Sequence, residues 1–123
     1  MSKDAFRQAA TFFADTVDAV GPSQWDEPAL GVWNVRDLIG HTSRSIARVA
    51  EFGQQRADKV DVSSAAEHYH VSLAPDGIDE AIAEAGREAG QWLGDDVSQT
   101  IRASFNATIA VLETIPDGTI IAY

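Results

Sequence analysis

The sequence contains no cysteine and one methionine, and its nine lysine and arginine residues face nineteen aspartates and glutamates. Without cysteine there is no disulfide framework, no thiolate metal site and no cysteine nucleophile. The formal net charge of −10 repels a phosphate backbone or an anionic membrane, so we expect neither nucleic acid nor membrane as a partner. Since an apolar leader and any run of about 18 apolar residues are also lacking, we expect a cytoplasmic protein.

The remaining composition is that of an ordinary globular protein. The 123 residues suffice for one hydrophobic core but not for two, so we expect a single domain over residues 1–123. A hydrophobic fraction of 45%, with three tryptophans and five phenylalanines, is typical of folded rather than disordered chains. The sequence contains no motif typical of a phosphate-binding loop, a nucleophile elbow, an HExxH metal site or an EF-hand. Composition therefore indicates an acidic globular domain and no more.

Apolar residues recur at the spacing of α-helices, which predicts an all-α fold. Ser2 is a suitable N-cap for the first helix, and Asn34 with Asp37 in the first turn is suitable for the second. The phase of the apolar pattern changes at Gly94, so we expect a break there with Asp95 or Asp96 as the next N-cap. We expect helices over residues 3–20, 34–56, 77–93 and 97–114. For residues 65–70, a short helix and a loop are both open alternatives.

Two lines of side chains run along the second predicted helix. The line expected to be buried is Val35, Leu38, Ile39, Thr42, Ile46, Val49 and Gly53. Beside it, the second line consists of His41, Ser45, Arg48 and Phe52. This arrangement places His41 at the edge of the buried face. In the helix over 77–93, Gly86 and Gly90 imply a close approach to a neighbour.

Two segments outside the helices are unusually apolar. The stretch before Asn34 holds Trp25 and Trp33, which either fold back over the core or, in the case of Trp33, wall a ligand pocket. Residues 119–123 have a strand-like composition. Either this tail pairs with another segment, or the chain is the front part of a longer one.

Three histidines are the whole inventory for a metal or for proton transfer near neutral pH. Asp37 lies four residues before His41, where a carboxylate can hold one imidazole nitrogen and leave the other for a metal or a proton. The plainer alternative is a structural histidine at the helix edge. His68 and His70 would share one side of a strand but diverge on a helix. Without a third ligand nearby, we interpret them as solvated loop histidines.

The segment LGVWNVRDLIGH, residues 30–41, resembles the start of the second helix in the mycothiol-dependent maleylpyruvate isomerase family of the DinB-like superfamily. In that signature, a Gly-Trp precedes a polar residue, Val, a base, Asp, an apolar pair and His. Here Val32 separates Gly31 from Trp33, which is a small departure. The resemblance extends over essentially the whole chain.

The resemblance implies a bundle of up-and-down antiparallel helices that holds one divalent, zinc-like metal, with His41 as a ligand. It places Asp37 and Trp33 beside that ligand, as its support or as a pocket wall. The family's remaining ligands lie on a later helix, where an acid or histidine precedes a histidine by four residues. The sequence shows no such helix, and Glu113 has no histidine four residues on, so we expect the last helix of the bundle to be missing from this chain.

Two functions follow from the resemblance. The first is the front part of an isomerase or transferase that depends on a metal and a mycothiol-type thiol and acts on a small-molecule electrophile. The second is a non-catalytic binding or dimerisation module of the same fold with an incomplete metal site. A homodimer could supply missing ligands in the first case. Three protein ligands with one open position make a catalytic zinc site, whereas one histidine does not.

Overall fold

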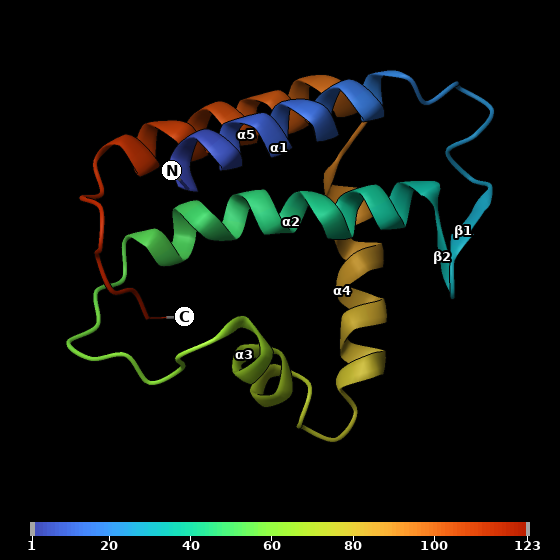
Figure 1. Cartoon of the computed structure of the whole chain (residues 1–123). Coiled ribbons are helices and arrows are strands. Elements are labelled where there is room, and N and C mark those ends of the chain that lie inside the picture. Colours follow the sequence, from blue (N-terminus) through green and yellow to red (C-terminus); the bar gives the residue numbers. More distant parts are fainter. Residues whose placement is uncertain (1, 123) are drawn as a thin grey trace.

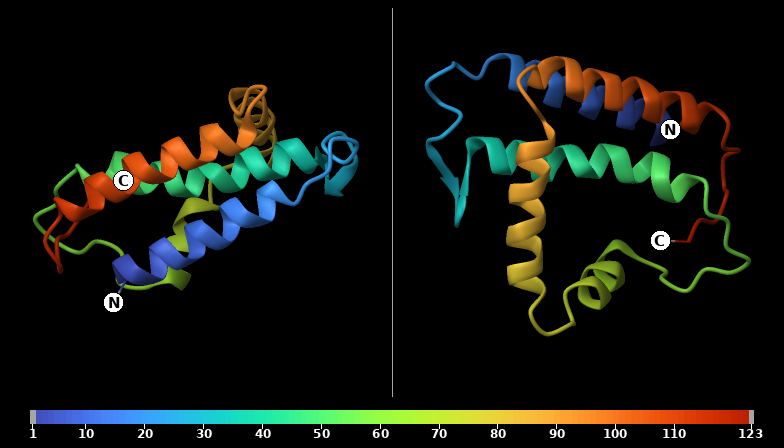
Figure 2. Two further views of the ribbon diagram at one scale, coloured as in Figure 1. Left: turned by 90° about the horizontal axis from the view of Figure 1, so that it is seen from above. Right: turned by 180° about the vertical axis from the view of Figure 1, so that it is seen from behind.

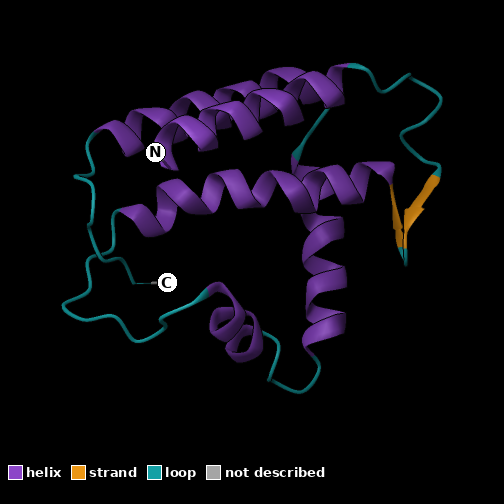
Figure 3. Cartoon of the chain, viewed as in Figure 1, coloured by secondary structure: helices purple, strands orange, loops and turns teal. Residues whose placement is uncertain are grey.

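The computed structural model describes residues 2–122, and its architecture is all-α as predicted (Figures 1 and 3). Helices α1 (Ser2–Asp18), α2 (Val35–Gly53) and α5 (Val97–Glu113) lie side by side, while α4 (Ile78–Trp92) runs across α2 (Figures 1 and 2). The short helix α3 (Ala65–Ser72) lies on the side of α2 away from α1 and α5. None of the described helices is long and apolar enough to cross a membrane.

The core lies where α1, α5 and the end of α4 meet. Leu93 and Ile101 are almost completely buried there, together with Ala14, Val17 and Val97. At the rim of this core, Arg102 of α5 forms ion pairs with Asp15 and Asp18 of α1. Trp25 packs against the same cluster, which confirms that the loop before Asn34 folds back over the core.

Helix α2 begins at the predicted N-cap, Asn34, which forms a capping box with Asp37. The Asn34 side chain accepts a hydrogen bond from the backbone N–H of Asp37 at 2.9 Å, and the Asp37 carboxylate accepts one from the N–H of Asn34 at 3.3 Å. The two bonds satisfy amide groups that the helix itself leaves unpaired. By contrast, Ser2 lies within α1 rather than capping it, and α1 ends at Asp18, two residues before its predicted end.

We expect Asn34→Ala to lower the free energy of unfolding by about 1 kcal/mol, because it removes one half of this box. Urea denaturation followed by circular dichroism measures the change. Ser64→Ala is the matched control, since Ser64 caps α3 in the same way but α3 forms no extensive contact with another described helix. Equal losses of stability in the two variants would contradict this account.

The break between the last two helices also follows the prediction. Gly94 adopts a left-handed conformation with φ of 68°, which favours glycine, and Asp96 caps α5 by accepting from the N–H of Gln99. Arg36 of α2 donates to the carbonyl oxygens of Gly90 and Gly94 at 3.3 and 3.1 Å, and its guanidinium lies over the Trp25 ring. These bonds hold the end of α4 against the start of α2.

The crossing of α2 and α4 is made by small residues. A Cβ on Gly40 would lie 2.3 Å from the backbone nitrogen of Gly90, so the two backbones are in direct contact. The predicted close approach at Gly86 and Gly90 is therefore confirmed. The apolar pattern alone misplaced part of the α2 face, however: Thr42 is exposed, whereas Gly40 and Ser43 are buried. At the end of α4, Trp92 is 57% exposed.

Two short stretches of pairing lie outside the helices. Strands β1 (Pro28–Leu30) and β2 (Trp33–Asn34) form a small antiparallel hairpin in the loop that we expected to be irregular (Figure 3). The tail pairs with the chain itself, through an antiparallel bridge between Ile121 and Arg56. The backbone N–H of Ala57 donates to Ile120, and that of Ala122 donates to Gln55. The first of the two alternatives for the tail is thus observed for its described part.

Candidate functional site

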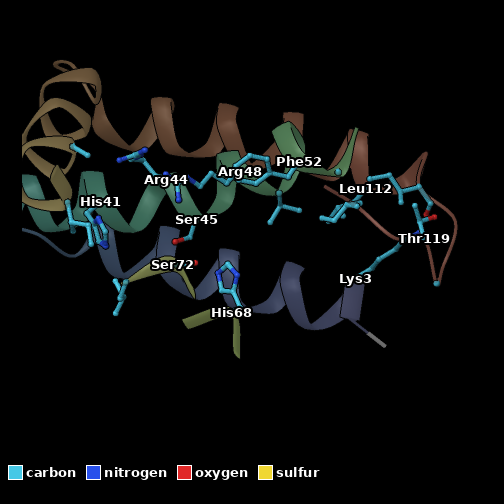
Figure 4. Close-up of a pocket in the computed structure, with 18 of the residues that line it drawn as sticks. Lys3, His41, Arg44, Ser45, Arg48, Phe52, His68, Ser72, Leu112 and Thr119 are labelled. Carbon is cyan, nitrogen blue, oxygen red and sulfur yellow. The ribbon is translucent and has the colours of Figure 1, made fainter. Parts of the chain in front are cut away.

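A cavity of about 990 Å³ lies between α2, α3, α4 and the segment that follows α5 (Figure 4). One wall is the second line of α2, since all four of its residues, His41, Ser45, Arg48 and Phe52, line the cavity together with Arg44. In Figure 4 these side chains occur on successive turns of α2. The side-chain spacing that set this line apart in the sequence therefore marks the wall of the cavity.

The other walls differ in chemistry from α2. The α4 wall is apolar and small, and α3 contributes two polar groups and one apolar group. The C-terminal segment, with Lys3 of α1, closes the far end, where Lys3 donates to the carbonyl of Ile115 at 2.6 Å and pairs with Asp117 at 3.7 Å. The α4 residues are Ile78, Ala81, Ile82 and Ala85, and those of α3 and its C-cap are His68, Ser72 and Leu73.

His41 is half-buried at one end of this cavity. Its Nδ1 atom is inaccessible to water and has no hydrogen-bond partner among the described residues. Burial lowers the pKa of the imidazole, and the positive charges of Arg44 and Arg48 lower it further. The ring is therefore neutral at pH 7 and can accept a hydrogen bond or a proton at an unprotonated nitrogen.

Trp33 covers one face of His41. The two ring centroids lie 4.5 Å apart with the planes tilted by 32°. The indole N–H donates to the carbonyl of Ala83 in α4 at 2.9 Å, and the indole fills the space that a side chain at Gly86 would need. Trp33 is not among the residues that line the cavity. Trp33 packs behind His41 and so fixes the orientation of the imidazole, which does line the cavity.

Asp37 does not support His41 in the way that its spacing suggested. Its carboxylate is engaged in the capping box with Asn34, and one carboxylate oxygen approaches Gly90. No carboxylate holds Nδ1 of His41, since that atom has no partner in the described part of the chain. Asp37 therefore fixes the start of α2 and acts on the site only through the position of the helix.

Residues 6–112 match the model of the mycothiol maleylpyruvate isomerase N-terminal domain. The chain belongs to this family. No curated protein and no solved structure matches it. The resemblance seen in residues 30–41 is thereby confirmed, and the family's DinB-like helical fold agrees with the five helices described here.

The donor set does not fit the three-ligand metal site that the resemblance implied. His41 and His68 line the same cavity, but across residues 2–122 no three histidine, aspartate or glutamate side chains come together as metal ligands. His70 is exposed on α3 and is not among the residues that line the cavity. A catalytic zinc needs three protein ligands. We therefore derive no reaction step through a metal in this family member.

Sequence reasoning missed two features of the site. Arg44 belongs to neither line of side chains identified on the second helix, yet it is half-buried and lines the cavity. Its position three residues after His41 was the available signal, because residues three or four apart share a helix face. The contribution of the segment after α5 carried no such local signal, since it depends on pairing between residues far apart in the sequence.

Proposed function

We propose that this domain binds a low-molecular-weight thiol of the mycothiol type in the cavity next to His41. In this proposal it serves an isomerase or transferase reaction in which the thiol attacks a small-molecule electrophile. The observation that carries the proposal is a single one. A neutral imidazole with a partnerless nitrogen lies at the end of a large cavity, beside two arginines, in a domain of the mycothiol isomerase family.

The shape and lining of the cavity support this function. Pockets for drug-sized ligands have volumes of roughly 300–1,000 Å³, and this cavity, at about 990 Å³, lies at the top of that range. It has room for a thiol compound and a small electrophile together. The polar α2 wall suits the hydroxyl-rich part of such a thiol, and the apolar α4 wall suits a carbon skeleton. Binding two reactants in one cavity aligns them for attack.

The second candidate is a non-catalytic binding or dimerisation module of the same fold. The observation in its favour is that the described residues offer no complete metal site. In a homodimer, a partner copy would supply the missing ligands around a divalent metal at His41. Light scattering of the purified protein gives the mass in solution. If the protein is a monomer, the dimerisation role is excluded and only the non-catalytic binding role of this candidate remains.

Titration calorimetry with mycothiol tests the proposed function, and Ser45→Trp is the variant of choice. Ser45 is exposed at the cavity wall on α2, so an indole at this position fills the cavity without disturbing the core. We expect the affinity for mycothiol to fall at least about tenfold, which corresponds to 1.4 kcal/mol.

Ala47→Trp is the matched control. Ala47 is exposed on the same helix but does not line the cavity, so this variant should bind mycothiol as the unaltered chain does. The proposal is wrong if the unaltered chain does not bind mycothiol, or if both tryptophan variants weaken binding equally.

A further inference from the structure

We propose that residues 58–76, which include α3, form a hinged lid that opens and closes the cavity between fixed points at Ala57 and Gly77. The lid controls the passage of small molecules between solvent and the walls that α2 and α4 contribute. This inference concerns access to the cavity, so it applies to whichever ligand the cavity binds and does not depend on thiol chemistry.

Helix α3 is attached to the rest of the protein by little packing. None of its residues is buried, and it forms no extensive contact with another described helix. Its apolar residues Tyr69 and Val71 are 63% and 58% exposed. Helices in folded proteins owe most of their stability to the burial of an apolar face against a neighbour. Moving α3 away from the cavity therefore gives up little buried apolar surface.

Backbone pairing holds the two ends of the lid but not the lid itself. At one end, the N–H of Ala57 donates to the carbonyl of Ile120 at 3.1 Å. At the other end, the carbonyl of Gly77 accepts from the N–H of Ala81 in α4 at 3.2 Å. Within the described chain, the backbone hydrogen bonds of residues 58–76 remain inside that segment. Motion of the lid between its two ends therefore breaks no backbone hydrogen bond to the rest of the protein.

The bonds that cap α3 are also internal to the lid. The Ser64 side chain accepts from the N–H of Glu67 at 3.1 Å. In turn, the Glu67 carboxylate accepts from the N–H and the hydroxyl of Ser63 at 2.8 and 2.9 Å. These bonds satisfy amide groups at the helix start without a partner from α2 or α4. Helix α3 therefore keeps its cap when it moves and can swing as one piece.

Gly77 has the properties of a hinge. Its φ of 75° lies in the left-handed region, and a Cβ at this position would have no atom within 4 Å. Neither a side chain nor a close neighbour restricts rotation of the backbone there. Beyond this hinge α4 is fixed, because its crossing with α2 is a direct backbone contact. Lid motions are absorbed at a few residues of this kind at the ends of elements.

The side of α3 that faces the cavity carries both polar and apolar groups. His68 and Ser72 are four residues apart and so share a helix face, and both line the cavity (Figure 4). Leu73, the C-cap of α3, adds an apolar group. With the lid closed, these side chains enclose a ligand against α2 and α4 and keep water from it. With the lid open, the α2 and α4 walls face solvent.

Thiol labelling of the free protein tests the lid, because the chain has no cysteine and an introduced one is the only thiol. Ala85→Cys places this reporter on the α4 wall, where Ala85 is half-buried and lines the cavity. The uncharged reagent N-ethylmaleimide modifies the thiol, and mass spectrometry follows the reaction. We expect the rate in the folded protein to be at least about tenfold below that of the same variant unfolded in urea.

Gly77→Ala, added to the reporter variant, should raise the labelling rate about fivefold or more, because a residue with a side chain is strained in the left-handed conformation. Rotation at the hinge relieves this strain when the lid opens, so the substitution favours the open state. Labelling proceeds through the open state, and its rate follows the population of that state.

Gly31→Ala is the matched control. Gly31 has a φ of 56° and also has no atom within 4 Å of its Cβ position, but it lies between β1 and β2, outside the lid. The same kind of strain there should leave the labelling of Ala85→Cys unchanged. Glu88→Cys, an exposed site on α4 outside the lining, should react equally fast with and without Gly77→Ala. Unfolding midpoints from circular dichroism establish that each variant folds.

Three outcomes would overturn the lid. If Ala85→Cys reacts as fast in the folded protein as in urea, α3 does not restrict access to the cavity. Equal acceleration by Gly77→Ala and Gly31→Ala would mean that unfolding of the whole protein exposes the reporter. An unchanged rate with Gly77→Ala would mean that the segment does not turn at this residue. None of these measurements uses mycothiol, so the lid and the proposed function stand or fail separately.

Discussion

Gly40→Ala should lower the free energy of unfolding by about 3 kcal/mol or more, the largest effect we expect of any single methyl group in this protein. The new Cβ would lie 2.3 Å from the backbone nitrogen of Gly90 and 2.5 Å from the carbonyl carbon of Ala89. A flexible side chain could turn away, but a helix backbone cannot. The two helices must separate, and the packing between α2 and α4 is then lost along its whole length.

Urea denaturation of the two proteins measures this loss. Gly21→Ala is the matched control, because its Cβ would meet only the end of the Gln24 side chain, at 3.3 Å. The control should change the free energy of unfolding by less than about 0.5 kcal/mol. A Gly40→Ala protein of unaltered stability would show that the two helices do not cross in direct backbone contact.

Gly86→Ala should lower stability by about 1–3 kcal/mol and also disturb His41. The added methyl group would lie 2.5–2.6 Å from three atoms of the Trp33 ring, so the indole must leave its place. It then loses its hydrogen bond to Ala83 and uncovers the face of the imidazole. We therefore expect a loss of stability together with a change in the surroundings of the His41 ring on α2.

Nuclear magnetic resonance can follow both rings, through the indole N–H of Trp33 and the ring signals of His41. In a Trp33→Leu background the methyl group has no indole to displace. The same substitution should then cost clearly less stability, which a double-mutant cycle measures. Additive effects of the two substitutions would contradict the direct contact between Gly86 and Trp33.

The local signals in the sequence predicted most of the fold. Asn34 with Asp37 gave the start of α2, and the change of phase at Gly94 gave the break between α4 and α5. Both features depend on residues close together in the chain. The burial of Gly40 escaped prediction, because it comes from backbone contact with α4 and an apolar pattern does not report such contact.

The candidate site was predictable in part, for the same reason. The second line of α2 lies on one helix, so its spacing alone placed His41 and Arg48 on a common face. What that face meets was not predictable. The indole of Trp33 is held against His41 by its hydrogen bond to Ala83 of α4, which lies fifty positions further along the chain.

Because α1 packs against α5, α1 cannot form its native contacts on the ribosome until α5 has been synthesised. Helix α1 finds its ion-pair partner, Arg102, only when α5 has been made. The strand-like pairing of residues 120–122 with 55–57 comes later still. Until then the nascent chain exposes the apolar face of α1, which invites chaperones or aggregation. Slow translation would lengthen that exposure. The yield of folded protein should therefore fall when the segment up to the end of α5 is translated more slowly.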